Sequence, residues 1–221
     1  MKLKSIIAAL LITLIPVQLF SSEIHQWRGS DRSGIFHETG LLKVWPAEGP
    51  KLNWSITGLG QGFSSVTVLN DKLYTTGVVD GKGFVFCIST NGKLLWKKEY
   101  GKDWTESFPG TRTTLVFQNN RLFMATAYGE ALCLDANNGN RIWSVDMTKK
   151  YGARTPKWGI VEAPVVLGNK VFFTPGGGEV AIVALNTKDG SEIWKSKATG
   201  DPSAYCSPLL VNHKGRAILV T

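Results

Sequence analysis

The stretch DANNGNRIW, residues 135–143, decides the fold, because a run of turn-forming residues leads directly into an isoleucine and a tryptophan. The same arrangement recurs in STNGKLLW (89–96) and NTKDGSEIW (186–194). Each copy places a glycine four residues before a tryptophan: Gly92 and Trp96, Gly139 and Trp143, and Gly190 and Trp194. The tryptophans are 47 and 51 residues apart, which is close to the length of a propeller blade built from four strands. We therefore interpret the stretch as one copy of a structural repeat.

Each copy of the repeat divides into four short strands. The copy begins with an apolar strand, which a turn rich in Asn and Gly joins to a second strand. A Gly-containing turn then leads to a third strand, and the Asn/Asp-Gly turn leads from there to the strand that carries the tryptophan. Adjacent residues in that last strand, such as Leu95 and Trp96, are both hydrophobic although they point to opposite faces. A sheet that is covered on both faces explains this pattern. The sequence therefore predicts an all-β protein, a β-propeller of four-stranded antiparallel blades in which the tryptophans wedge between blades.

The repeats also predict the organisation of the chain. We expect blades at about 62–101, 110–147 and 160–198, the start of a fourth at 205–221, and a leader with a closing strand at 23–56. In that leader, Trp54 resembles the end of a fourth strand that would complete the last blade of a closed ring. The sequence stops inside an expected strand, so we expect a partial propeller, about half of a ring of seven or eight blades.

The first 22 residues have the pattern of a cleaved secretory signal peptide. Lys2 and Lys4 precede an apolar run at 6–20, and two serines follow it. A retained membrane anchor is the less favoured alternative, because the run is short and Pro16 and Gln18 interrupt it. No cysteine follows the run, so no lipid-attachment site is present. We predict a periplasmic or secreted protein with no membrane span after signal removal.

The net charge of +8 does not indicate a nucleic-acid partner. Lysines and arginines are scattered instead of forming runs, and no nucleic-acid-binding module is visible. We therefore expect no nucleic acid among the partners of this protein.

The cysteines occur at a repeat position. Cys87 and Cys133 align with each other and with Ala184 in the third copy, which indicates a small buried strand position. We interpret both as core residues, although a disulfide between neighbouring blades remains an alternative. Cys206 is the third cysteine, and no zinc-type spacing exists among the cysteines and histidines.

Two copies of the repeat resemble a known family. CLDANNGNRIW (133–143) and ALNTKDGSEIW (184–194) resemble the ALDxxTGxxxW hallmark of the PQQ-like (pyrroloquinoline quinone) propeller repeat. The segments 27–54 and 158–166 resemble the leader and a loop of exported members. The resemblance covers roughly residues 25–221 and implies a propeller with tryptophan-docking repeats. It implies less about function, because one fold hosts many functions.

The family contains two functional classes. Quinoprotein dehydrogenases bind PQQ and calcium and oxidise alcohols or sugars, whereas BamB-type scaffolds of outer-membrane assembly carry no cofactor. This chain lacks both the adjacent cysteine pair of alcohol-oxidising members and the lipid-bearing cysteine of BamB-type proteins. We expect an exported non-catalytic scaffold without a cofactor, binding other proteins or an extracellular polymer. The alternative is a PQQ- and calcium-dependent dehydrogenase.

Four residues are candidates for the central funnel, because they precede the first strands that would line it: Arg112, Trp158, Glu162 and Tyr205. Arg112 could hold an anionic group, and Glu162 could ligate a cation or act as a base. Alternatively, these two side chains pair with each other or with backbone groups and lock adjacent blades. No residue is assigned a catalytic role.

Overall fold

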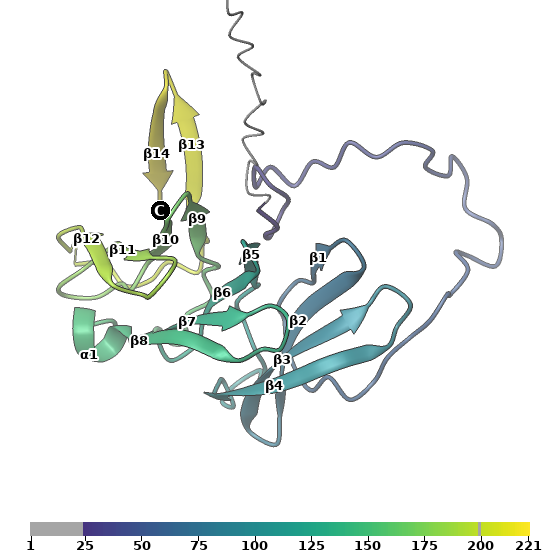
Figure 1. Ribbon diagram of the computed structural model, residues 1–221, viewed down its shortest axis with the longest axis horizontal. Helices are drawn as coiled ribbons and strands as arrows, with labels where there is room; N and C mark the ends of the chain where they lie inside the picture. Colours follow the sequence, from purple (N-terminus) through teal and green to yellow (C-terminus); the bar gives the residue numbers. More distant parts are fainter. Residues whose placement is uncertain (1–23, 199) are drawn as a thin grey trace, which may run out of the picture.

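A computed structural model of the chain describes residues 24–198 and 200–221, so the predicted signal peptide lies outside the described residues. Three four-stranded antiparallel sheets and a two-stranded hairpin follow one another along the chain. Figure 1 shows them fanned side by side, with β1, β5, β9 and β13 on the inner side of the fan. The prediction of an all-β fold with four-stranded antiparallel blades is confirmed.

The first blade comprises β1 (Thr67–Leu69), β2 (Lys72–Val79), β3 (Lys82–Ser89) and β4 (Leu94–Lys102). The second comprises β5 (Val116–Gln118), β6 (Arg121–Ala125), β7 (Glu130–Asp135) and β8 (Arg141–Asp146). The third comprises β9 (Val165–Leu167), β10 (Lys170–Phe173), β11 (Val183–Asn186) and β12 (Glu192–Lys195). The hairpin consists of β13 (Leu209–His213) and β14 (Arg216–Val220), and a short helix α1 (Met147–Tyr151) follows β8. None of the helices in the described part of the chain is long and apolar enough to cross a membrane.

The core lies between the blades instead of inside any one of them. Leu122 and Phe123 are neighbours in β6, and both are fully buried. Leu122 packs with Tyr74 and Val85 of the first blade, whereas Phe123 packs with Val171 of the third blade. Both faces of the second blade are therefore covered, which is the physical reason for the two-sided hydrophobicity of its strands.

The tryptophans pack on the glycine turns of the following blade. A Cβ atom added to Gly139 would lie 2.7 Å from the ring of Trp96, and one added to Gly190 would lie 2.8 Å from Trp143. Both glycines adopt positive φ angles, 72° and 73°, which other residues rarely adopt. The glycine thus supplies the turn and the space, and the tryptophan of the preceding blade fills that space.

Trp54 packs in the same way on the first blade. Its ring lies where a Cβ of Gly92 would project, and its indole N–H donates to the Thr90 carbonyl at 2.8 Å. The structure assigns no strand to residues 50–56, because a strand requires a neighbour that pairs with it and none lies beside this segment. That this segment closes the last blade of a ring therefore stays a prediction.

The cysteine positions face the tryptophans within each blade. Cys87 is paired with Trp96, Cys133 with Trp143, and Ala184 with Trp194. The two cysteines and the alanine are fully buried, as expected of a small core position in the repeat. Both thiols are free, so the alternative of a disulfide between neighbouring blades does not apply.

This burial predicts a simple pattern of thiol reactivity. Burial raises the pKa of Cys133 to about 12 and also raises that of Cys87, whereas Cys206 is exposed. Because the thiolate is the reactive species, a thiol reagent at pH 8 should modify Cys206 alone in the folded protein and all three cysteines in denaturant. A Cys206→Ser variant should show no fast-reacting thiol. Fast modification of that variant without denaturant would show that the inter-blade core opens.

The start of the leader contacts the inner strands of the blades and the residues directly before them. His25 forms an antiparallel bridge with Phe117 of β5, through backbone hydrogen bonds of 3.1 and 2.8 Å. Arg32 is 6% exposed, and its guanidinium donates to the carbonyls of Pro164 and Pro208, the latter at 2.8 Å. The two prolines occupy equivalent positions, directly before β9 and β13. One buried cation therefore ties the leader to two blades, and burial lowers its pKa to about 10.

Candidate functional site

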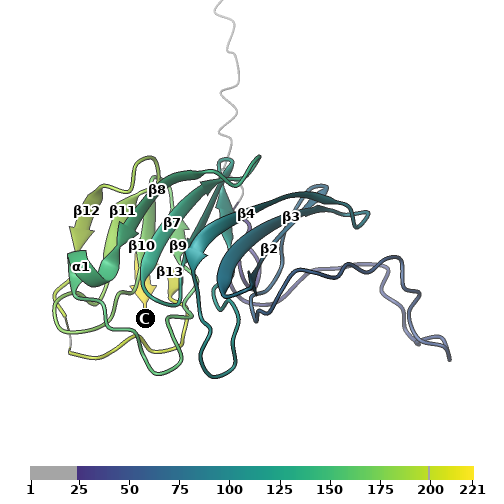
Figure 2. The same ribbon diagram turned by 90° about the horizontal axis from the view of Figure 1, so that it is seen from below.

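The loops that lead into the first strands lie at one end of the blades. We name them the axial loops: residues 60–66, 109–115, 158–164 and 202–208, which directly precede β1, β5, β9 and β13. Figure 2 shows the connections into β5 and β9 projecting at the same end of the sheets. Because each loop occupies the same place in its blade, side chains from successive loops can meet.

Three of the four predicted funnel residues meet in one place. The Trp158 backbone N–H donates to the Tyr205 hydroxyl at 3.2 Å, and the two rings lie 5.6 Å apart between centroids at an angle of 47°. The Tyr205 backbone N–H donates to Oε1 of Glu162 at 3.0 Å. The structure therefore brings Trp158, Glu162 and Tyr205 together at the junction between the third blade and the loop before β13.

Glu162 is the buried centre of this junction, with 4% of its surface exposed. Oε1 also accepts the Ser203 hydroxyl, and Oε2 accepts the Val161 N–H at 3.1 Å. The adjacent Ala163 N–H donates to Oγ of Ser207 at 2.9 Å. A buried carboxylate is costly unless hydrogen bonds compensate it, so these bonds explain how the charge is accommodated.

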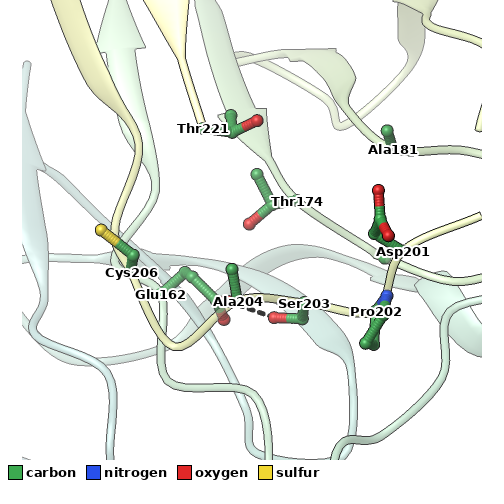
Figure 3. A pocket seen from close by; sticks show the side chains of 10 residues that line it. Glu162, Thr174, Ala181, Asp201, Pro202, Ser203, Ala204, Cys206 and Thr221 are labelled. Atoms are coloured by element: carbon green, nitrogen blue, oxygen red, sulfur yellow. Dashed lines mark hydrogen bonds between the residues drawn. The ribbon is translucent and has the colours of Figure 1, made fainter. Parts of the chain in front are cut away.

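A cavity of about 370 Å³ lies against this carboxylate. Figure 3 shows Glu162 and Ser203 on one side of it, with Thr174 and Asp201 also directed into the space. The other residues that line the cavity have small side chains or none: Gly176, Ala181, Pro202, Ala204, Cys206 and Thr221. A space with two carboxylates and two hydroxyls among small residues can accept hydrogen bonds from a hydroxyl-bearing ligand.

The cavity keeps its shape because of one glycine. Gly176 has a φ of 62°, and a Cβ atom there would lie 2.2 Å from the Ser203 backbone nitrogen. The neighbouring Gly177 N–H donates to the Asp201 carbonyl at 3.1 Å. The glycine-rich turn after β10 thus allows the 201–203 segment to approach closely.

Arg112 lies in a different place from the other three candidates. Its guanidinium donates to the carbonyls of Ser107 and Phe108, at 3.2 and 2.7 Å, within its own loop. It also lies over the rings of Phe63 and Trp104, at 5.1 and 5.7 Å from their centroids. Arg112 and Glu162 therefore each bond to backbone groups, in separate loops.

Sequence reasoning missed a second buried carboxylate, Asp103. Its Oδ1 accepts the N–H groups of Trp104 and Ala127, at 2.7 and 3.2 Å, and its Oδ2 accepts the Tyr100 hydroxyl. Burial raises the pKa of this carboxyl despite these bonds. Asp103 joins the first and second blades, but the repeat does not mark it consistently, because the residue at the same distance after Trp143 is Lys150.

The described residues do not form the metal or cysteine arrangement that the dehydrogenase resemblance implies. They contain no group of three or more His, Cys, Asp or Glu side chains that could hold a metal ion. Cys87 and Cys133 are buried in different blades, and Cys206 is exposed.

Comparisons with known proteins identify relatives of both functional classes. The family model described as outer membrane protein assembly factor BamB matches residues 81–221. XoxF of Paracoccus denitrificans, which is named as a dehydrogenase, is 27% identical over 179 residues, covering 76% of this chain and 29% of that protein. The outer membrane protein assembly factor BamB of Salmonella typhimurium is 28% identical over 108 residues, covering 48% of this chain and 26% of that protein.

Solved structures show the same fold. A europium-containing methanol dehydrogenase superposes with a TM-score of 0.50 and 21% identity, over 66% of this chain and 27% of that one. This likeness concerns the fold alone. The chain spans less than a third of the length of the curated relatives described above.

Proposed function

Because this chain belongs to the BamB-like PQQ-repeat family, we propose that it forms part of a non-catalytic propeller that acts as a binding or assembly scaffold. The protein would act outside the cytoplasm, as the signal-like first 22 residues indicate. Its partners would be other proteins or an extracellular polymer. BamB of Salmonella typhimurium is named as an assembly factor, which makes a scaffold role consistent with the family.

The observation that supports this proposal is that polar side chains of the axial loops form hydrogen bonds within the protein. Glu162 accepts three hydrogen bonds from its own and the following loop, and Arg112 is bonded to carbonyls of the loop before β5. A general base must be free to accept a proton from a substrate. Groups that hold loops together in this way support a rigid binding surface instead of acid–base chemistry.

A second candidate function is a PQQ- and calcium-dependent alcohol or sugar dehydrogenase. The match to XoxF over 76% of this chain is the observation that favours it. The two functions differ in whether the protein binds the quinone.

The test is a titration of the full-length protein with PQQ in the presence of calcium, followed by calorimetry. A scaffold is expected to show no saturable PQQ binding and no reduction of an electron-accepting dye with alcohols or sugars. An established quinoprotein dehydrogenase, reconstituted in the same way, is the positive control. Stoichiometric PQQ binding together with dye reduction would overturn the scaffold proposal in favour of the dehydrogenase.

A further inference from the structure

We propose that the groove between the start of the leader and β1 binds an extended acidic protein segment, which adds as a strand to the inner edge of β1. This inference rests on the proposed scaffold function and specifies the chemistry of its partner. The groove has a volume of about 950 Å³, at the upper end of the range for ligand sites, roughly 300–1,000 Å³. It is lined by residues 24–30, Gly34 and Phe36 of the leader and by residues 65–68 and Asn70 of the first blade.

The inner edge of β1 carries main-chain groups that β2 does not use. Leu69 and Lys72 are paired on either side of a two-residue turn. Residues in that position exchange hydrogen bonds with each other, so the next residue, Val68, directs its N–H and C=O away from β2. In the described part of the chain, no strand or bridge pairs with this edge, and no backbone group outside the hairpin bonds to Val68. An unpaired edge of this kind binds another polypeptide backbone, which a nucleic acid or a glycan does not have.

β5 shows that an inner edge of this protein accepts an extended segment. Phe117 is the middle residue of β5 and lies two residues before its turn, as Val68 does in β1. Its N–H donates to the His25 carbonyl at 2.8 Å, and its carbonyl accepts the His25 N–H at 3.1 Å. The leader therefore pairs with the inner edge of β5 and leaves the corresponding edge of β1 open beside the groove.

Side chains beside this edge offer apolar contacts on one face. Thr67 is buried, whereas Val66 and Val68 are 52% and 50% exposed. Because side chains alternate along an extended chain, the two valines lie on the same face, and both line the groove. Trp27 and Phe36 of the leader also belong to the lining. In strand addition, main-chain hydrogen bonds supply affinity, and side-chain contacts such as these supply specificity.

The charge of the groove favours an acidic segment. Arg28 lines the groove, and its guanidinium lies over the Trp27 ring, 4.4 Å from the centroid. None of the described residues in the lining is Asp or Glu. A carboxylate in the bound segment therefore meets a cation and no like charge, whereas a lysine-rich segment would be repelled.

The experiment selects peptides of about ten residues from a random display library on the full chain, because that length extends beyond both ends of β1. The most enriched peptide is synthesised, and its binding to the full chain is measured by calorimetry. We expect enriched sequences to alternate apolar residues with Asp or Glu and to exclude proline from their centre, since proline cannot donate to the ladder. The amide hydrogen of Val68 should exchange more slowly with solvent when the peptide is bound.

Val68→Pro tests the main-chain edge. Proline removes the N–H that points away from β2, and an edge strand tolerates it there because that N–H takes no part in the β1–β2 pairing. We expect this variant to raise the dissociation constant of the peptide by about tenfold. Asn212→Pro is the matched control, because Asn212 lies at the same position before the turn of the β13–β14 hairpin and does not line the groove. Circular dichroism establishes that both variants fold.

Arg28→Glu tests the charge of the groove. We expect this variant to weaken binding of the acidic peptide by about tenfold, and added salt should weaken binding to the unmodified protein. Lys43→Glu reverses an exposed charge of the leader outside the groove, so it should leave the dissociation constant unchanged.

Each other outcome would overturn the proposal. If the library yields no peptide that binds the full chain, the groove is not a strand-addition site. Binding that survives both Val68→Pro and Arg28→Glu, or that leaves hydrogen exchange at Val68 unchanged, would place the peptide elsewhere. Dimerisation of the chain that Val68→Pro abolishes would assign the groove to a second copy. None of these results would affect the scaffold proposal, which fails only if PQQ binds and dye is reduced.

Discussion

Replacing Trp143 with alanine is expected to lower the free energy of unfolding by about 3–5 kcal/mol, the usual cost of removing a large buried aromatic side chain. Trp143 is 7% exposed, it packs with Phe123, and its indole N–H donates to the Thr187 carbonyl at 3.1 Å. Its removal would leave a cavity between the second and third blades, over the turn at Gly190. Urea unfolding followed by circular dichroism measures the loss.

Trp194→Ala is the matched control. Trp194 occupies the same repeat position but is 39% exposed, and its recorded ring contact is with Phe172 of its own blade. We expect this variant to lose about 1 kcal/mol or less of its free energy of unfolding, as is usual for a partly exposed position. Equal losses for the two variants would show that the tryptophans stabilise their own blades and that docking on the next blade contributes little.

Arg32→Ala should be the second most damaging substitution. We expect the free energy of unfolding to fall by about 2–4 kcal/mol, because charged hydrogen bonds are lost and carbonyls are left unsatisfied. The guanidinium bonds to Gln26 at 2.9 Å and to the carbonyls of Pro164 and Pro208. Alanine would leave two buried carbonyls without this donor and release the leader from two blades. Urea unfolding would report the stability, and proteolysis would report detachment of the leader.

Arg28→Ala provides the control for this substitution. Arg28 and Arg32 both have positive φ angles, 63° and 59°, so the backbone cost of alanine should be alike in both. Arg28 is exposed and lies over the ring of Trp27 at 4.4 Å. A difference in the free energy of unfolding between the two variants therefore measures the contribution of the buried contacts of Arg32. Equal stability and equal proteolysis would contradict the anchoring role of Arg32.

The candidate site was predictable in part. Trp158, Glu162 and Tyr205 could be placed in loops before first strands, and they do lie together, whereas Arg112 lies in a separate loop. Asp201 and Ser203 were not predicted, because no repeat marks them and a serine or aspartate in a loop is common. Arg32 was also missed, since nothing in the leader sequence distinguishes a buried arginine from the exposed Arg28.

The sequence by itself determined the blade. The spacing of glycine and tryptophan, the Asn and Gly turns and the two-sided hydrophobicity are local features, and each acts within about 50 residues. Only the tertiary structure decided which loops meet. The bonds from Arg32 to the carbonyls of Pro164 and Pro208 span 132 and 176 residues. Such contacts depend on how blades stack around an axis, and stacking places residues together that share no pattern along the chain.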